Sequence, residues 1–258
     1  GDAQSKKIVF SGDLGRYDNP VLYDPAAVDG ADVLVVESTY GNKENPVDDP
    51  EDAIAEIVNE TVARGGCVVI PAFAVGRAQG ILHYLQLLEK QRKIPVLPVY
   101  LDSPMAVTVA DLYARHLDSH KLPLDRSDND IFFLRDLDYV EKAADSKRLN
   151  DLKGRAIIVS ASGMCEGGRI VHHLYHRLPR QQDTLLLAGY QAAGTRGRRI
   201  LDGEPEVKMF GEWVPVRCRV ASINGLSGHA DRSELMRWLS SFRQAPKRTF
   251  IVHGEPEA

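Results

Sequence analysis

The chain has 258 residues, enough for one large or two smaller domains, and 43% of them are hydrophobic and 26% charged, as in soluble globular proteins. The formal net charge of −4 argues against nucleic-acid binding by a positively charged surface as a whole, but it is compatible with a local basic groove. Cys67, Cys165 and Cys218 are widely spaced and lack zinc-ribbon spacing, which predicts reduced, buried thiols in an intracellular protein.

No apolar run is long enough to span a membrane, and no signal peptide is recognisable, so a cytoplasmic protein without membrane association is expected. The chain starts with Gly rather than Met, and a strand-like run follows almost at once. These features favour a segment excised from a longer protein.

A short apolar run followed by a small or polar loop and then a helical pattern recurs along the chain. The clearest case is residues 65–91, in which Val68 to Ile70 suit a buried strand, and Ile81, Leu82, Leu85 and Leu88 repeat at helical spacing. Residues 94–116, 154–178, 183–203 and 218–242 follow the same pattern. Alternating strands and helices predict an α/β fold with a mostly parallel sheet and flanking helices.

Two stretches interrupt this alternation. Asn42 to Asp52 is polar and broken by Pro, which makes it a candidate domain boundary. Leu117 to Leu149 is charged and weakly periodic, and helices and loops at a domain edge are expected there.

Four residues fall at strand ends, where ligands gather in open α/β sheets. The strand-like runs "KKIVFSGD", "ADVLVVEST" and "RTFIVHGE" lead to Asp13, Glu37 and His253, and the loop "GLSGHAD" carries His229. Imidazole and carboxylate are suitable ligands for Zn²⁺ or Mn²⁺, and they are also common acid–base groups. The residues therefore predict a metal site or an acid–base site.

Each of these residues also has a simpler interpretation when it is taken alone. Asp13 fits a turn or a helix N-cap, and Glu37 fits the start of a polar loop. His229 fits a cap of the helix expected near Arg232, and His253 fits a strand-end histidine bonded to a carbonyl. The functional hypothesis depends on their convergence.

The motifs "FSGDLGR", "VVESTYGN", "PAFAVGRAQ", "VSASGM", "GYQAAGTRGR", "SGHAD" and "IVHGE" occur in this order along nearly the whole chain. Each motif is weak alone, but the ordered set is specific. It resembles the metallo-β-lactamase-fold nucleases of the β-CASP group, which includes ribonuclease J and the endonuclease subunit of the cleavage and polyadenylation factor.

This resemblance implies a role for each strand-end residue. Asp13 would bridge two zinc ions, His253 would be a zinc ligand, and Glu37 would support the active site near the phosphate. His229 would contact the scissile phosphate or protonate the leaving oxygen. Family members that act on DNA tend to carry Val at the position of His253, so the histidine favours single-stranded RNA as the substrate.

The chain departs from the family in its metal ligands. The family's His-x-His-x-Asp-His motif and a later His do not precede Asp13. Zinc needs three or four protein ligands, and Asp13 and His253 alone are too few for two ions. We therefore expect the chain as it stands to bind zinc weakly or not at all and to lack nuclease activity.

The resemblance also implies a partition of the chain and a set of RNA contacts. Residues 1–41 and 228–258 would be parts of a metallo-β-lactamase (αββα) domain, and residues 42–227 would form the inserted β-CASP domain. Small residues, helix starts and Arg suit phosphate binding. The candidate RNA-binding residues are Gly76, Arg77, Ser160, Ser162, Gly163 and Arg196.

Other functions are less consistent with the sequence. His172 and His176 lie one helical turn apart, but no carboxylate accompanies them, so a structural or solvated role is expected. No nucleophile elbow or dinucleotide fingerprint is present. The leading hypothesis is a zinc-dependent ribonuclease, and a homodimer is a candidate assembly. The alternative is a non-catalytic RNA-binding or assembly subunit, and a hydrolase of small thioesters or lactams is disfavoured by the long insertion.

Overall fold

The computed structural model describes residues 5–45, 50–122, 131–132, 134–223 and 225–257. The chain divides into two compact units. Unit 1 comprises residues 1–47 and 227–258, and unit 2 comprises residues 48–226. The candidate boundary at 42–52 contains the first of these divisions, and each unit is described here by itself.

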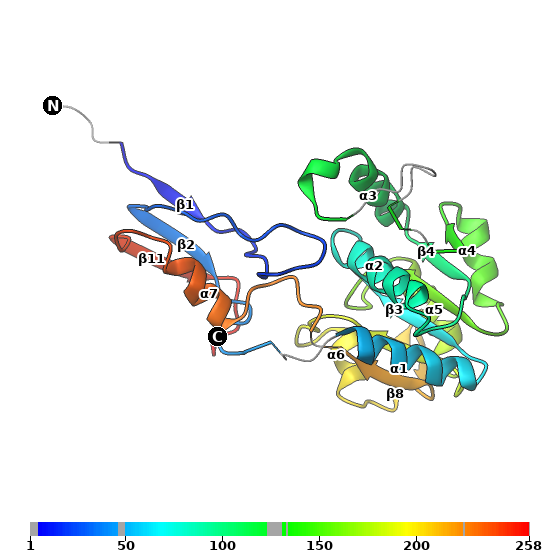
Figure 1. The fold of residues 1–258 in the computed structure, drawn as a ribbon. Helices are drawn as coiled ribbons and strands as arrows, with labels where there is room; N and C mark the ends of the chain where they lie inside the picture. Colours follow the sequence, from blue (N-terminus) through cyan, green and yellow to red (C-terminus); the bar gives the residue numbers. More distant parts are fainter. Residues whose placement is uncertain (1–4, 46–49, 123–130, 133, 224, 258) are drawn as a thin grey trace. The chain divides into compact units, whose positions relative to one another are not determined.

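Unit 1 contains a three-stranded parallel sheet in the order β1 (Ile8–Phe10), β2 (Val33–Glu37) and β11 (Arg248–Val252) (Figure 1). One face of the sheet packs on α7 (Arg232–Leu239), because Leu34 and Val36 of β2 form a core with Leu235 and Trp238. The indole of Trp238 also donates a hydrogen bond to the carbonyl of Ala26 at 2.9 Å, which ties the helix to the loop after β1.

The opposite face of this sheet is apolar and open. The register places Phe10 beside Val35 and Val35 beside Phe250, so one row of apolar side chains crosses all three strands. Phe10 is 72% exposed and Phe250 is 51% exposed. Four residues of the run "RTFIVHGE" suit a buried strand by their sequence, but that expectation is wrong, because every residue of β11 is exposed.

Unit 2 is built on a six-stranded parallel sheet in the order β10-β7-β3-β6-β4-β5. Its central strands are buried on both faces and read as continuous apolar runs, as expected for a parallel sheet flanked by helices. The strands are β3 (Cys67–Pro71), β4 (Val99–Asp102), β5 (Leu137–Tyr139), β6 (Ala156–Ser160), β7 (Thr184–Leu187) and β10 (Arg219–Ser222).

Helices of unit 2 connect these strands (Figure 1). They are α1 (Pro50–Ala63), α2 (Arg77–Lys90), α3 (Pro104–Arg115), α4 (Ala143–Asn150), α5 (Arg169–Arg177) and α6 (Arg196–Leu201), with a short 3-10 turn at Leu117–Ser119. The antiparallel hairpin β8 (Glu206–Met209) and β9 (Glu212–Pro215) adds Val207, Met209 and Val214 to the core around α5. The α/β fold with mostly parallel strands is therefore confirmed.

The three cysteines are free and buried, as predicted. Burial raises the pKa of the Cys165 thiol to about 12 and that of Cys218 to about 11, so both remain protonated at neutral pH. In the described parts of the chain, no helix has the length and apolar character needed to cross a membrane.

Candidate metal and acid–base site

Three strands of unit 1 deliver side chains to the same edge of their sheet. Glu37 is the last residue of β2, His253 follows β11 directly, and Asp13 lies three residues beyond β1. Because the strands are parallel and adjacent, their carboxyl ends meet at this edge. His229 joins them from the loop that precedes α7.

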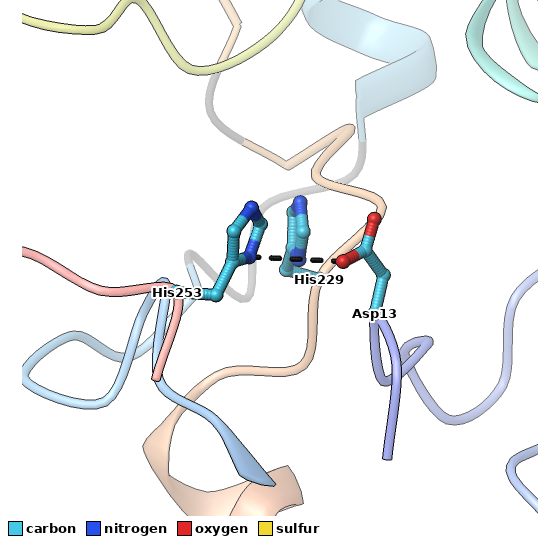
Figure 2. Close-up of side chains that lie close together, drawn as sticks. All are labelled: Asp13, His229 and His253. Atoms are coloured by element: carbon cyan, nitrogen blue, oxygen red, sulfur yellow. Dashed lines mark ion pairs between the residues drawn. The ribbon is translucent and has the colours of Figure 1, made fainter. Parts of the chain in front are cut away.

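Asp13, His229 and His253 face one another (Figure 2). Each offers one potential ligand atom, and these atoms all lie within 4.8 Å of one another. The Nδ1 atom of His253 is 3.6 Å from a carboxylate oxygen of Asp13. The imidazole centroids of His229 and His253 are 5.5 Å apart. The side chains of Asp13 and His253 are more than half exposed, so an ion or a ligand can reach them from solvent.

Glu37 is buried next to this cluster and contacts His229. The residue is 2% exposed, and its carboxylate accepts hydrogen bonds from the amide of Leu14 at 2.5 Å and the hydroxyl of Thr39 at 2.6 Å. Nδ1 of His229 lies 2.9 and 3.0 Å from the two carboxylate oxygens. Burial alone raises the pKa of Glu37, but the hydrogen bonds from His229, Thr39 and Leu14 outweigh it and hold the pKa below its ordinary value of 4.5. Glu37 is therefore a carboxylate at neutral pH.

The contact with Glu37 decides what the His229 ring can do. A carboxylate accepts hydrogen bonds only, so Nδ1 of His229 carries a proton. The other ring nitrogen, Nε2, is the one that can bind a metal or exchange a proton with a ligand. His229 is thus a positioned acid–base or ligand group.

The loop around His229 is fixed by local hydrogen bonds. The hydroxyl of Ser227 accepts the His229 amide at 3.0 Å, and the amide of Ala230 donates to the carbonyl of Leu14 at 2.8 Å. Asp231, not His229, is the N-cap of α7, and it forms a capping box with Glu234. The capping interpretation of His229 is therefore wrong.

Thr39 is a further member of the site, and the sequence motifs did not predict it. Its hydroxyl lies 3.1 Å from Nδ1 of His253 and donates a hydrogen bond either to Glu37 or to the carbonyl of His253, which is 2.9 Å away. His253 has a left-handed backbone with φ 55°, which this contact helps to fix. Thr39 follows Glu37 by two residues in "ESTYG". This short spacing could have indicated that its hydroxyl reaches the Glu37 carboxylate.

The predicted RNA-binding residues lie in unit 2, at the carboxyl ends of the sheet strands or at helix starts. Gly76 is the N-cap of α2 with φ 77°, which favours glycine, and Arg77 is the first residue of the helix. Ser162 and Gly163 lie in the loop between β6 and α5. The role of these four residues in RNA binding stays a prediction.

Ser160 and Arg196 have internal contacts. Ser160 is 1% exposed, and its hydroxyl donates to the carbonyl of Asp102 at 2.7 Å. The guanidinium of Arg196 donates to the carbonyls of Cys165 and Lys208. Both residues join neighbouring segments of unit 2, and their roles in RNA binding also stay predictions.

A buried polar network lies beneath the loop that carries Ser162 and Gly163. Asp102, at the end of β4, is fully buried and contacts His173 at 2.5 Å, Ser146 at 2.6 Å and Arg169 at 2.7 Å. Burial raises the pKa of Asp102, but the hydrogen bonds from His173, Ser146 and Arg169 outweigh it and lower the pKa below 3.8. Arg169 is the first residue of α5, so the network anchors the end of the loop.

A cluster of imidazoles and carboxylates at the ends of parallel strands is typical of metal-dependent hydrolases. Two family models match the chain, and one of them is a domain of zinc-dependent metallo-hydrolases. The Beta-Casp domain matches residues 78–200, and the Zn-dependent metallo-hydrolase RNA specificity domain matches residues 213–258. The second match includes His229 and His253.

Several named proteins are similar to the chain over nearly its whole length. Ribonuclease TTHA0252 of Thermus thermophilus is 38% identical over 98% of the chain and 58% of the relative. Transcription termination factor FttA of Methanosarcina mazei is 32% identical over 97% of the chain and 41% of the relative. The RNase J-like protein of Methanocaldococcus jannaschii is 32% identical over 98% of the chain and 59% of the relative.

The resemblance to the β-CASP family, which the ordered motifs predicted, is therefore confirmed by both domain matches and by these relatives. The chain spans between 41% and 59% of the length of these three relatives.

Proposed function

We propose that the chain is part of a zinc-dependent hydrolase that cleaves phosphodiester bonds of single-stranded RNA. The observation that carries the proposal is the convergence of Asp13, His229 and His253 above the buried Glu37. The match to an RNA specificity domain and the ribonucleases among the relatives support RNA as the substrate.

The donor set fits zinc. The imidazole nitrogen of His253 and the carboxylate oxygen of Asp13 are typical zinc ligands, and a tetrahedral zinc site places its donor atoms about 3.4 Å apart. Nδ1 of His253 and a carboxylate oxygen of Asp13 are 3.6 Å apart, and with a ring nitrogen of His229 they form a cluster within 4.8 Å. Rotations of the exposed Asp13 and His253 side chains would close the remaining difference. Zinc bound here would polarise a phosphate oxygen and lower the pKa of a coordinated water.

Residues of the chain would supply the remaining chemistry. Glu37 holds the proton on Nδ1 of His229, so Nε2 faces the ligand. In its imidazolium form, stabilised by the Glu37 carboxylate, His229 would donate its Nε2 proton to the leaving oxygen as a general acid, so the zinc ligands of this chain would be Asp13 and His253. Thr39 would keep His253 in place through its contacts with the ring and the carbonyl.

In this proposal, residues 1–41 and 228–258 belong to a metallo-β-lactamase domain, and residues 42–227 form the β-CASP domain. The missing His-x-His-x-Asp-His motif leaves the strand-end donors as the ligands available in the described residues. We therefore propose that the chain by itself binds zinc weakly and lacks the nuclease activity of an intact enzyme.

Zinc titration calorimetry on the purified chain tests the metal assignment. His253→Ala removes one of the two proposed zinc ligands and is expected to lower the zinc affinity at least about tenfold. His172→Ala removes an exposed histidine of unit 2 and is the matched control, with no change expected. Equal affinities of the two variants would refute the assignment, and two tightly held zinc ions in the unaltered chain would refute weak binding.

Cleavage of labelled single-stranded RNA by the protein that carries this chain with its flanking sequence tests the activity. Asp13→Asn is expected to abolish cleavage while RNA binding persists. Equal cleavage by both forms would exclude Asp13 as a metal ligand. RNA binding without cleavage by the unaltered protein would favour a non-catalytic RNA-binding subunit.

A further inference from the structure

Phe73 is a half-exposed aromatic residue at the ligand-binding edge of the unit 2 sheet. It lies two residues beyond β3, which is an interior strand between β6 and β7. Its exposed fraction is 48%, although its neighbours Ala72 and Ala78 are buried. The carboxyl ends of interior parallel strands are where α/β sheets bind ligands.

The phenyl ring is supported from one side by Gly163. A Cβ atom on Gly163 would lie 2.9 Å from Cδ2 and 3.0 Å from Cε2 of Phe73, so only glycine lets the ring rest against the loop after β6. The backbone on either side of the ring is also fixed, because Ala72 donates to Ser160 at 2.9 Å and Ala78 donates to Phe73 at 3.1 Å. The ring is therefore held in place before any ligand binds, which reduces the entropy lost on binding.

Exposed apolar side chains accompany the ring. Val75 is 63% exposed, and Met105, in the first turn of α3, is 64% exposed. The side-chain amide of Gln79 donates to the carbonyls of Ala74 and Ala106, at 3.1 and 3.3 Å. These bonds join the loop of Phe73 and Val75 to the turn that carries Met105.

Positive charge lies on the same edge. Arg77 starts α2 four residues after Phe73, and its guanidinium reaches the end of β7, 3.8 Å from the position of a Cβ on Gly189. An aromatic ring and a basic group on one edge are the combination with which proteins bind single-stranded nucleic acid without reading its sequence. The guanidinium favours an anionic polymer over an apolar peptide as the occupant.

We propose that Phe73 is a stacking site for one unpaired base of single-stranded RNA, with Val75 and Met105 at its rim and Arg77 on the adjoining phosphate. The inference rests on the proposed function and adds to it the means of selecting single strands. Bases of a duplex are stacked on each other, whereas an unpaired base can lie on the ring. Because every base has a π face, the site accepts any base.

Fluorescence anisotropy with a labelled single-stranded RNA, in the presence of a chelator that prevents cleavage, tests the proposal on the purified protein. Phe73→Ala is expected to weaken binding about 5- to 100-fold, and Phe73→Leu nearly as much, because leucine is apolar but cannot stack. Phe73→Trp is expected to retain binding. Phe210→Ala is the matched control, since Phe210 is 59% exposed in the same unit.

Salt dependence separates stacking from phosphate contact. Phe73→Ala is expected to lower affinity without changing the slope of log affinity against log salt, whereas Arg77→Ala is expected to reduce the slope by about one. An RNA with abasic sugars should bind the unaltered protein and Phe73→Ala equally.

The outcomes distinguish the two proposals. If the unaltered protein binds RNA but Phe73→Ala and Phe73→Leu bind like Phe210→Ala, the stacking site is refuted and the proposed function stands. If the unaltered protein fails to bind RNA at any salt concentration, both are refuted. Circular dichroism of each variant checks the fold, and the comparison of Leu with Trp at position 73 remains informative if the alanine variant unfolds.

Discussion

The contacts of Glu37 make a quantitative prediction about stability. Glu37→Gln keeps the size of the side chain but removes its charge. The amide of Gln offers one oxygen and one NH₂ group where the carboxylate offered two oxygens. Leu14 and His229 both donate to Glu37, and Thr39 does so in one of its two arrangements, so the NH₂ group must face a donor or force Thr39 to turn.

The expected loss follows from these three bonds. A hydrogen bond to a charged group contributes about 1.5–3 kcal/mol, and a neutral one about 0.5–1.5 kcal/mol. Losing the charge therefore costs about 1 kcal/mol for each bond, and about 3 kcal/mol of unfolding free energy in total. Because the pKa of Glu37 is lowered on folding, this stabilisation is complete above pH 4.5 and is lost as the pH falls through the lowered pKa.

Urea denaturation followed by tryptophan fluorescence measures this effect. Trp238 is buried in unit 1 and Trp213 lies in unit 2, so a Trp213→Phe background restricts the signal to unit 1. Glu44→Gln, at an exposed position of unit 1, is the matched control, and its stability should not change. Equal stability of Glu37→Gln and the unaltered protein at pH 7 would refute the reasoning. A deficit that stays the same at pH 3 would refute it as well.

Two further substitutions probe buried polar contacts. Asp231→Ala removes the N-cap of α7, whose side chain accepts the amide of Glu234 at 2.9 Å, and it should destabilise unit 1 by about 1–2 kcal/mol in the same Trp238 assay. Asp102→Asn leaves the buried Arg169 and His173 contacts without their carboxylate and should destabilise unit 2 by about 3–5 kcal/mol at pH 7 in chemical denaturation. Because the pKa of Asp102 is lowered on folding, this deficit should shrink as the pH falls below 3.8, and a deficit that does not depend on pH would contradict the assignment.

Much of the fold could be predicted because buried parallel strands and amphipathic helices leave simple patterns. Val68 to Ile70 form part of β3, and Ile81, Leu82, Leu85 and Leu88 are buried in α2, as predicted. The hairpin of β8 and β9 was missed, although Glu206 to Met209 alternate between exposed and buried positions. The exposure of β11 could not be predicted, because an apolar run does not show whether anything covers it.

The site was predicted in part for a similar reason. The rule that ligands gather at strand ends identifies Glu37, Asp13 and His253 without knowledge of which residues touch. The network of Asp102 and His173 was not identified, because 71 residues separate them and no local pattern connects them. The contact forms only when the whole fold brings the end of β4 next to α5. The spacing of the two residues in the sequence does not show this.

The open face of the unit 1 sheet affects how the protein behaves in solution. A row of apolar side chains runs from Phe10 through Val35 to Phe250. An apolar surface of this kind promotes association between molecules when it is exposed to solvent. These side chains are carried by the strands, whereas Asp13, Glu37 and His253 lie at the strand ends. Charged replacements at Phe10 and Phe250 thus offer a way to adjust solubility separately from the chemistry at the strand ends.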